Sequence, residues 1–276
     1  MNTRILTVIL ITFCAASFAQ PKRFFYEHRF ADDSTNVNVN SKELMVLDID
    51  TEGSRYYAFP VLAEDSLKVL KQTRPGRYPY QGIQNLDVIA KKYPSYEYNF
   101  YSSLGSSNYL IVYKKDLDWK LENESKKLNG YIVKKATAKL YNRKWVAWYA
   151  PDLPIQDGPY VFHGLPGLII KIEDELKSQI FELTGIKNLK PYHRDYIPYY
   201  FDKRLITIDD KKWTNLLKDF HENPYAEDIA DSSPNNTYRW DDGTVISKSE
   251  FFKRKEFLLK ARRKKENNLI RFEFIR

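Results

Sequence analysis

The sequence is poor in the residues and motifs that many enzymes of known chemistry require. It contains one cysteine, Cys14, four histidines and ten glycines among 276 residues. A single cysteine excludes a disulfide within the chain. The sequence has no G-x-S-x-G serine elbow, no H-E-x-x-H metal motif and no glycine-rich phosphate loop. We therefore expect a non-enzymatic protein without cofactor or metal, and a hydrolase with an unrecognised site is the alternative.

Long apolar runs are also scarce, and the one at the N-terminus predicts export. Arg4 is followed by the apolar core Ile5–Phe13 and by small residues up to Ala19, which is the pattern of a cleaved signal peptide. This core is too short to span a bilayer, which takes about 20 residues. Cys14 would suit a lipoprotein, but Phe13 stands where a lipobox has a small residue. We expect cleavage after Ala19 and a periplasmic or outer-membrane-associated protein.

Aromatic residues and positive charge are present in excess. Hydrophobic residues make up 43% and aromatic residues 15%, with 21 tyrosines, which favours β structure in a globular protein. The formal net charge is +8. Much of it lies near the C-terminus, at Lys253, Arg254, Lys255, Lys260, Arg262, Arg263, Lys264 and Lys265. Export argues against nucleic acid as a partner, so we interpret this run as a solvated helix face, with contact to anionic lipid as the alternative.

Alternating apolar residues and turn residues predict a succession of short strands. The expected strands are Arg23–Phe30, Glu43–Ile49, Arg55–Phe59, Tyr109–Tyr113, Trp119–Leu121, Ile132–Tyr141, Lys144–Ala150, Leu168–Ile172, Gln179–Ile186 and Leu269–Ile275. A short helix is expected near Asn85–Lys91. Short strands joined by short turns imply an antiparallel sheet.

Two amphipathic helices are predicted near the C-terminus. The first, Ile208–Glu222, has Thr207 as its N-cap and an apolar stripe that begins at Trp213. The second follows the capping box Ser247–Glu250 and continues to about Glu266. Its apolar residues are expected to bury against the sheet: Phe251, Phe252, Leu258 and Leu259.

The predicted fold class is mainly β with α: a curved, antiparallel, half-barrel-like sheet with two C-terminal amphipathic helices on its concave or open side. A signal peptide, residues 1–19, is followed by residues 20–276, which show no repeat or linker and are expected to form a single domain. By analogy of fold alone, this arrangement resembles periplasmic lipoprotein carriers, in which helices cover an apolar cavity.

The most distinctive window runs from residue 143 to residue 174. Within it, Pro166-Gly167 predicts a type II turn that leads into a buried strand. The window's motif residues are Trp145, Trp148, Pro154, Gly158, Pro159, Gly164, Leu165, Pro166, Gly167, Leu168 and Ile169. It resembles the GLPGLI family of exported proteins from Bacteroidetes-type bacteria. The resemblance implies export and a β-rich fold, but that family has no established activity, so we interpret the motif as structural.

Other polar residues support weaker site hypotheses. The acidic pairs in Asp48–Asp50 and Asp116–Asp118 would point the same way on a strand and could hold calcium, but we interpret them as turn and edge residues. Glu173 and Asp174 could act as acid and base only with a raised pKa and a cleft. The best candidate contact surface, which could instead roof the sheet, is Tyr192, Arg194, Tyr196, Tyr199 and Tyr200.

These observations lead to one expected function and two alternatives. We expect an exported, non-enzymatic protein that binds an apolar ligand or a cell-envelope protein, with peripheral membrane contact as a further option. The alternatives are an enzyme, such as a hydrolase, and an outer-membrane β-barrel. The sequence indicates neither the ligand nor the oligomeric state.

Overall fold

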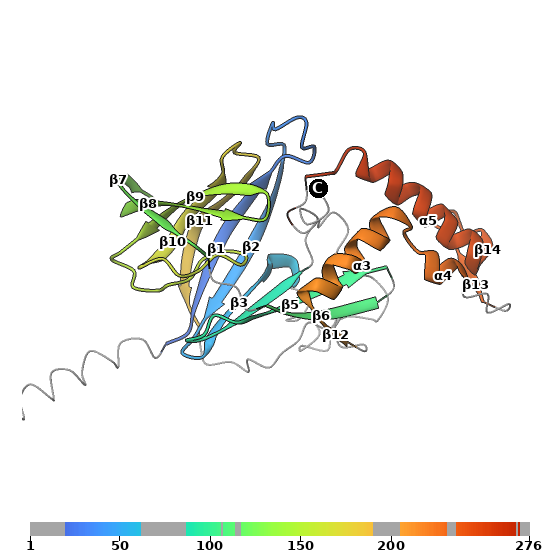
Figure 1. The fold of residues 1–276 in the computed structure, drawn as a ribbon, viewed down its shortest axis with the longest axis horizontal. Helices are drawn as coiled ribbons and strands as arrows, with labels where there is room; N and C mark the ends of the chain where they lie inside the picture. The colour runs from blue at the N-terminus through green and yellow to red at the C-terminus, as the bar shows by residue number, and fades with distance from the viewer. Residues whose placement is uncertain are drawn as a thin grey trace, which may run out of the picture.

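The structure, a computed structural model, describes residues 20–61, 87–105, 107–113, 117–189, 205–230, 236–268 and 270. The expected signal peptide and the expected contact surface around Tyr192–Tyr200 lie outside the described residues, as does nearly all of the expected strand Leu269–Ile275. Most of the described chain forms one large, curved and unclosed sheet (Figure 1). The predicted fold class, mainly β with C-terminal helices, is thereby confirmed.

Twelve strands make up this sheet. They are β1 Lys22–Phe30, β2 Ser41–Ile49, β3 Gly53–Ala58, β4 Val88–Lys92, β5 Tyr98–Leu104, β6 Ser107–Tyr113, β7 Lys120–Leu128, β8 Tyr131–Leu140, β9 Arg143–Ala150, β10 Leu168–Asp174, β11 Gln179–Asn188 and β12 Leu205–Asp209. Their order is β12-β6-β5-β4-β3-β2-β1-β11-β10-β9-β8-β7. Neighbours pair antiparallel, except that β12 runs parallel to β6. The hairpin predicted between Leu168–Ile172 and Gln179–Ile186 is confirmed as β10–β11.

One predicted element is wrong. The helix expected near Asn85–Lys91 is the strand β4 over its described part, paired with β3 on one side and β5 on the other. Val88 and Ile89 are both buried there. In a strand covered on both faces, apolar and polar residues do not alternate strictly. Its short apolar run therefore has the same sequence pattern as a segment of buried helix.

The concave side of the sheet is filled by residues 151–167, which connect β9 to β10 and are called here the motif loop. Its Tyr160 ring lies 6.3 Å from Phe100 of β5 and 6.5 Å from Phe181 of β11. Its Phe162 ring lies 4.7 Å from Trp145 of β9. Because β5 and β11 are far apart in the strand order, only a curved sheet brings both against one ring. The motif loop, rather than the helices, therefore fills this part of the concave face.

The C-terminal part contains α3 Asp210–Glu222, α4 Ala226–Ala230, a small hairpin of β13 Thr237–Arg239 and β14 Val245–Ser247, and α5 Lys248–Arg263. Helix α3 packs on β6 and β12 through Trp213, whose ring lies 5.5 Å from Tyr109. Its N-cap is Asp209, which accepts from the Lys212 N–H at 2.8 Å, and not Thr207 as expected. The reason is that β12 continues through Asp209 before the helix begins.

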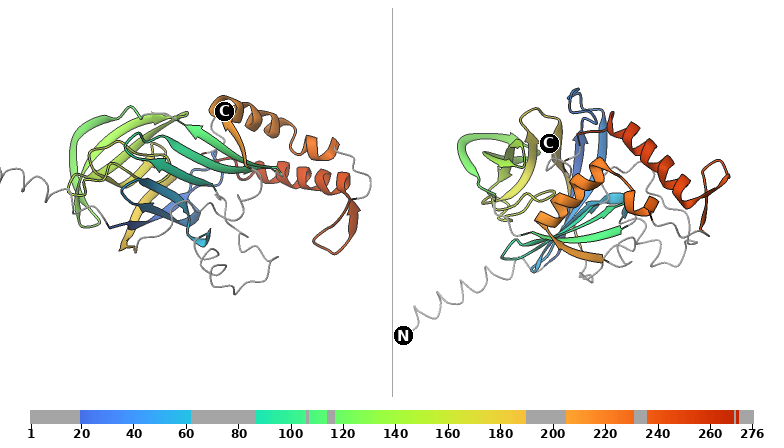
Figure 2. Two further views of the ribbon diagram at one scale, coloured as in Figure 1. Left: turned by 90° about the horizontal axis from the view of Figure 1, so that it is seen from below. Right: turned by 45° about the vertical axis from the view of Figure 1, so that its right-hand side comes forward.

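Helix α5 departs from the prediction in its packing. Its capping box is confirmed, because the Ser247 hydroxyl accepts from the Glu250 N–H at 3.2 Å. The helix contacts α4, β13 and β14 and extends away from the sheet (Figures 1 and 2). Phe252 is buried, but Leu258 is 54% exposed. The expectation that its apolar seam buries against the sheet is therefore wrong. Within the part of the chain described, no helix has the length and apolar character needed to cross a bilayer.

Candidate functional site

The motif loop is tied to the sheet by two glycines that allow close approach. A Cβ on Gly167, whose φ is +154°, would lie 2.2 Å from the Ala150 carbonyl oxygen, and a Cβ on Gly158 would lie 2.7 Å from Cδ1 of Ile169. The Gly167 N–H donates to the Leu165 carbonyl at 2.7 Å. This bond closes a three-residue turn around Pro166, so the predicted type II turn is wrong. A glycine is nevertheless required there.

A buried ion pair anchors the motif loop to strand β4 of the sheet. Lys91 of β4 and Asp157 of the loop both have side chains without solvent exposure, and the Lys91 ammonium donates to the Asp157 carboxylate. It also donates to the carbonyls of Gly158 at 2.9 Å and Phe162 at 3.3 Å. Burial lowers the pKa of Lys91, while Asp157 opposes this shift. Because three acceptors surround the nitrogen, its three N–H donors are all used, and Lys91 acts as a clamp rather than a nucleophile.

Two tyrosines continue this network toward the surface. The Tyr93 hydroxyl donates to the other Asp157 oxygen, and the Tyr93 ring lies 4.9 Å from that of Tyr96. Tyr96 stacks on His163 with ring centroids 4.8 Å apart and planes 2° from parallel. Burial, and then the charge of Asp157, raise the pKa of both tyrosines, so both remain neutral phenols. Tyr96 has a φ of +53°, a strained backbone conformation for a residue other than glycine. Such conformations are found more often at binding sites than elsewhere.

These tyrosines form one wall of a cavity of about 440 Å³, called here the motif pocket. Its described lining comprises Gln20, Lys22, Ile49, Asp50, Thr51, Tyr93, Tyr96, Pro154, Ile155 and Gln156. The lining is therefore mixed, with aliphatic and aromatic surface beside a lysine, a carboxylate and amides. None of these residues is a serine, cysteine or histidine, the side chains that most often serve as nucleophile or base.

The structure places the motif residues in different environments. Trp145 is buried inside the sheet, whereas Trp148 points to the opposite face, where Lys126 lies 3.6 Å from its ring centroid. Pro154 lines the motif pocket. The others serve packing or turns within the loop and β10: Gly158, Pro159, Gly164, Leu165, Pro166, Gly167, Leu168 and Ile169. The motif thus shapes a loop and supplies one pocket wall.

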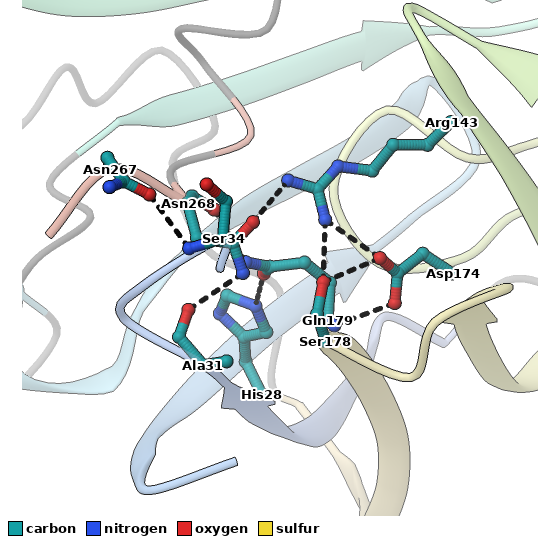
Figure 3. A network of polar contacts seen from close by, with 9 residues as sticks. All are labelled: His28, Ala31, Ser34, Arg143, Asp174, Ser178, Gln179, Asn267 and Asn268. Atoms are coloured by element: carbon teal, nitrogen blue, oxygen red, sulfur yellow. Dashed lines mark hydrogen bonds and ion pairs between the residues drawn. The ribbon is translucent and has the colours of Figure 1, made fainter. Parts of the chain in front are cut away.

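A second polar cluster joins the C-terminal segment to the sheet (Figure 3), and we call it the joint network. Arg143 of β9 donates to Asp174 at 2.8 Å, to the Ser178 hydroxyl at 2.8 Å and to the Asn268 side chain at 2.7 Å. The Asn268 side chain donates to the Ala31 carbonyl at 2.8 Å. An open cavity of about 320 Å³ lies beside these residues.

The joint network is suited to holding structure rather than to catalysis. The Ser178 hydroxyl donates to Asp174 at 2.6 Å, and this carboxylate also accepts from Arg143 and from the Gln179 N–H at 2.9 Å, so its oxygens are already engaged in holding the cluster together. Deeper in the cluster, His28 contacts Gln179 at 2.8 Å and stacks on the Phe181 ring. Burial lowers the pKa of His28 to about 4, although Gln179 opposes the shift, so this ring is neutral at pH 7.

The remaining sequence hypotheses find other partners. Asp48 is bound in bidentate fashion by Arg23, with both N–O distances at 2.7 Å, and its partner in the proposed pair, Asp50, accepts from turn N–H groups. Glu173 pairs with Lys171 at 2.8 Å. Asp116 lies outside the described residues. Among the residues that are described, no three histidine, cysteine or acidic side chains are grouped to hold a metal ion.

Sequence reasoning missed Lys91, Asp157, Tyr93 and Tyr96. A signal was present in Val88-Ile89-Ala90-Lys91-Lys92-Tyr93: read as a strand, it puts Ile89, Lys91 and Tyr93 on one face. A lysine on an inward face requires a buried acidic partner. The motif window supplies one, Asp157, directly before Gly158.

Comparison with known proteins supports the fold and a short family match. Residues 140–171 match the model of a family described as a protein of unknown function (Porph_ging). No curated protein sequence matches the chain. Two solved structures of PNGF-II, in P21 and C2 crystal forms, are similar over 72% of this chain, with TM-scores of 0.52 and 0.51 and identities of 16% and 17%. The chain spans only 33% and 32% of those chains, and at such identity the likeness concerns the fold alone.

Proposed function

We propose that this protein is an exported, non-enzymatic protein of the cell envelope that binds a small amphipathic ligand in the motif pocket. The observation that carries the proposal is the pocket wall of Tyr93 and Tyr96, held from below by the fully buried Lys91–Asp157 pair. A wall fixed in this way loses little conformational entropy when a ligand binds.

The pocket lining supports a particular ligand chemistry. Ile49, Ile155 and the tyrosine rings offer a surface for an apolar or ring-shaped group, while Lys22 and Asp50 offer opposite charges for polar ends. A purely apolar ligand would leave those charged groups desolvated at a cost. The proposed ligand is therefore amphipathic rather than wholly apolar.

The envelope location rests on the sequence. The apolar core Ile5–Phe13, followed by small residues up to Ala19, supports export and cleavage after Ala19. Binding is favoured over catalysis because the described lining contains no serine, cysteine or histidine.

The experiment is recovery of the native protein from the envelope fraction, followed by mass spectrometry of the small molecules that co-purify with it. We compare Tyr96→Asn, which removes the wall but tolerates the positive φ, with Tyr225→Asn, the same change at a tyrosine with φ +63° between α3 and α4. We expect a retained amphipathic molecule to fall at least tenfold in Tyr96→Asn and to persist in Tyr225→Asn. Equal retention by both variants, or no retained molecule in the wild type, would contradict the proposal.

A further inference from the structure

Helix α5 exposes one large aromatic side chain, Phe257, on the face that turns away from its packing partners. Phe257 is 72% exposed and its neighbour Leu258 is 54% exposed. On the packed face, Phe252 is buried and Phe251 stacks on Tyr238, with ring centroids 4.7 Å apart. The helix is thus held in place by one face while a large aromatic side chain is left in water on the other.

The exposed phenylalanine lies among cations. Three lysines share the helix face of Phe257. Lys253 is four positions before it, Lys260 is three positions after it, and Lys264 is seven positions after it. All three lysines are exposed. They and Phe257 form what we call the α5 outer face.

Carboxylates neutralise only part of this charge. Glu256 pairs with Lys260 of the outer face, while Glu250 pairs with Arg254, and Glu266, just after the helix, pairs with Arg262. From Phe257 to Glu266 the sequence has five basic residues and one acidic residue. The excess of positive charge therefore lies in the C-terminal half of α5 and directly after it. The carboxylate of Asp242 interacts electrostatically with Arg254, which is near the start of the helix.

We propose that the α5 outer face binds the surface of a membrane rich in anionic lipid. Phe257 would be inserted at the acyl boundary, and the lysines around it would lie among the phosphate groups. A single exposed aromatic side chain beside lysines suits a lipid surface, because a protein partner would need a broader apolar patch. This surface is separate from the motif pocket, so either proposal can fail alone.

The test uses the purified full chain carrying Phe257→Trp and vesicles of phosphatidylethanolamine with about one third phosphatidylglycerol, an anionic lipid. We expect binding that weakens at high salt. Because the chain has five other tryptophans, the signal of the new indole is the difference from wild-type protein, and this difference should shift to the blue and be quenched by brominated lipid. Vesicles of phosphatidylcholine alone should bind at least tenfold more weakly. The quenching distinguishes insertion from attraction to phosphate alone.

A matched pair of variants then locates the contact. Phe257→Ser with Lys253→Glu and Lys264→Glu should reduce binding at least tenfold. Leu121→Ser with Lys120→Glu and Lys127→Glu makes comparable changes at exposed residues of the edge strand β7 and should leave binding unchanged. Equal loss in both variants would overturn the proposal. So would equal binding to neutral vesicles, or binding to heparin as strong as binding to anionic vesicles without any shift of the indole fluorescence.

Discussion

At the scale of single residues, buried charge determines where the motif loop lies. A loop that packed only through Tyr160 and Phe162 could shift along the aromatic interior at little cost. The Lys91–Asp157 pair cannot shift, because a buried charge without its partner costs about 3–5 kcal/mol. We therefore interpret the pair as fixing the position of the loop, and with it the pocket wall at Tyr93.

A first prediction concerns Gly167. Gly167→Val should strongly destabilise the protein, because its Cβ would overlap the Ala150 carbonyl oxygen at 2.2 Å in addition to the strain at φ +154°. Gly130→Val is a matched control, since Gly130 has φ +86° and nothing within 4 Å of its Cβ position. Strain alone costs roughly 1–3 kcal/mol, so the control should lose about that much and Gly167→Val clearly more. Thermal melts measure the gap, and equal midpoints would show that the close approach to Ala150 is absent.

At the scale of elements, the strands that could be predicted from sequence were apolar runs bounded by clear turn residues. β9 and β10 could be predicted because Trp145, Ala147 and Ile172 belong to apolar runs bounded by clear turn residues. β4 could not, because Lys91 interrupts its apolar run and its partner Asp157 is distant in sequence. Loop residues such as Tyr160 follow no period, so their place in the core, and the motif pocket beside them, could not be read from pattern.

The α5 packing could not be predicted for a different reason. A seam such as Phe251, Phe252, Leu258 and Leu259 shows that a helix has an apolar side, but not what covers it. Rings of Tyr238 and Trp240, from the small hairpin and its turn, cover Phe251, and the sheet does not. The hairpin of β13 and β14 is short, so it covers only the N-terminal half of α5 and leaves the C-terminal half exposed.

A second prediction concerns how the segment after α5 is held to the sheet. Asn268→Ala removes the acceptor of Arg143 and the donor to the Ala31 carbonyl, both in buried or partly buried positions. Losing such bonds costs about 1–3 kcal/mol where a buried partner is left unsatisfied. Hydrogen exchange should accelerate at the backbone N–H groups of residues 267 and 268, which donate to the Asp32 carbonyl, while β9 remains protected.

Asn267→Ala is the control for this variant. Asn267 accepts from the Ser34 N–H at 2.8 Å in a partly buried position, so its loss should have a smaller effect. Exchange that accelerates equally across the sheet in Asn268→Ala would show that the joint network supports the whole fold rather than one attachment.

At the scale of the whole molecule, an unclosed sheet has two edges that must be protected from pairing with other chains. β7 carries five charged residues among nine, and charged side chains discourage pairing along an edge. β12 at the other edge is short, with five residues. Helix α3 packs beside it. The large sheet therefore remains open without presenting a long apolar edge, and the proposed pocket and membrane surface lie on different parts of the chain.

The last prediction concerns the pH dependence of the whole molecule's stability. In the unfolded chain His28 titrates near its ordinary pKa of about 6.5, whereas in the fold its pKa is about 4. Between these values the unfolded state binds a proton that the native state does not. The contribution of His28 to the free energy of unfolding is therefore complete above about pH 6.5, and it is lost progressively as the pH falls to about 4. The loss amounts to about 3 kcal/mol.

Chemical denaturation at a series of pH values, with wild type and His28→Phe, isolates this contribution. The phenylalanine can retain the stack on Phe181 but cannot bind a proton, and Gln179 keeps its bond to the Asn268 carbonyl at 2.8 Å. Carboxylates titrate in both proteins, so the difference between the two curves reports His28 alone. We expect the variant to be less stable at pH 7, because Gln179 loses a partner, and the difference in unfolding free energy to shift by about 3 kcal/mol in favour of the variant between pH 6.5 and pH 4. Parallel curves across that range would show that His28 is accessible to protons in the folded protein.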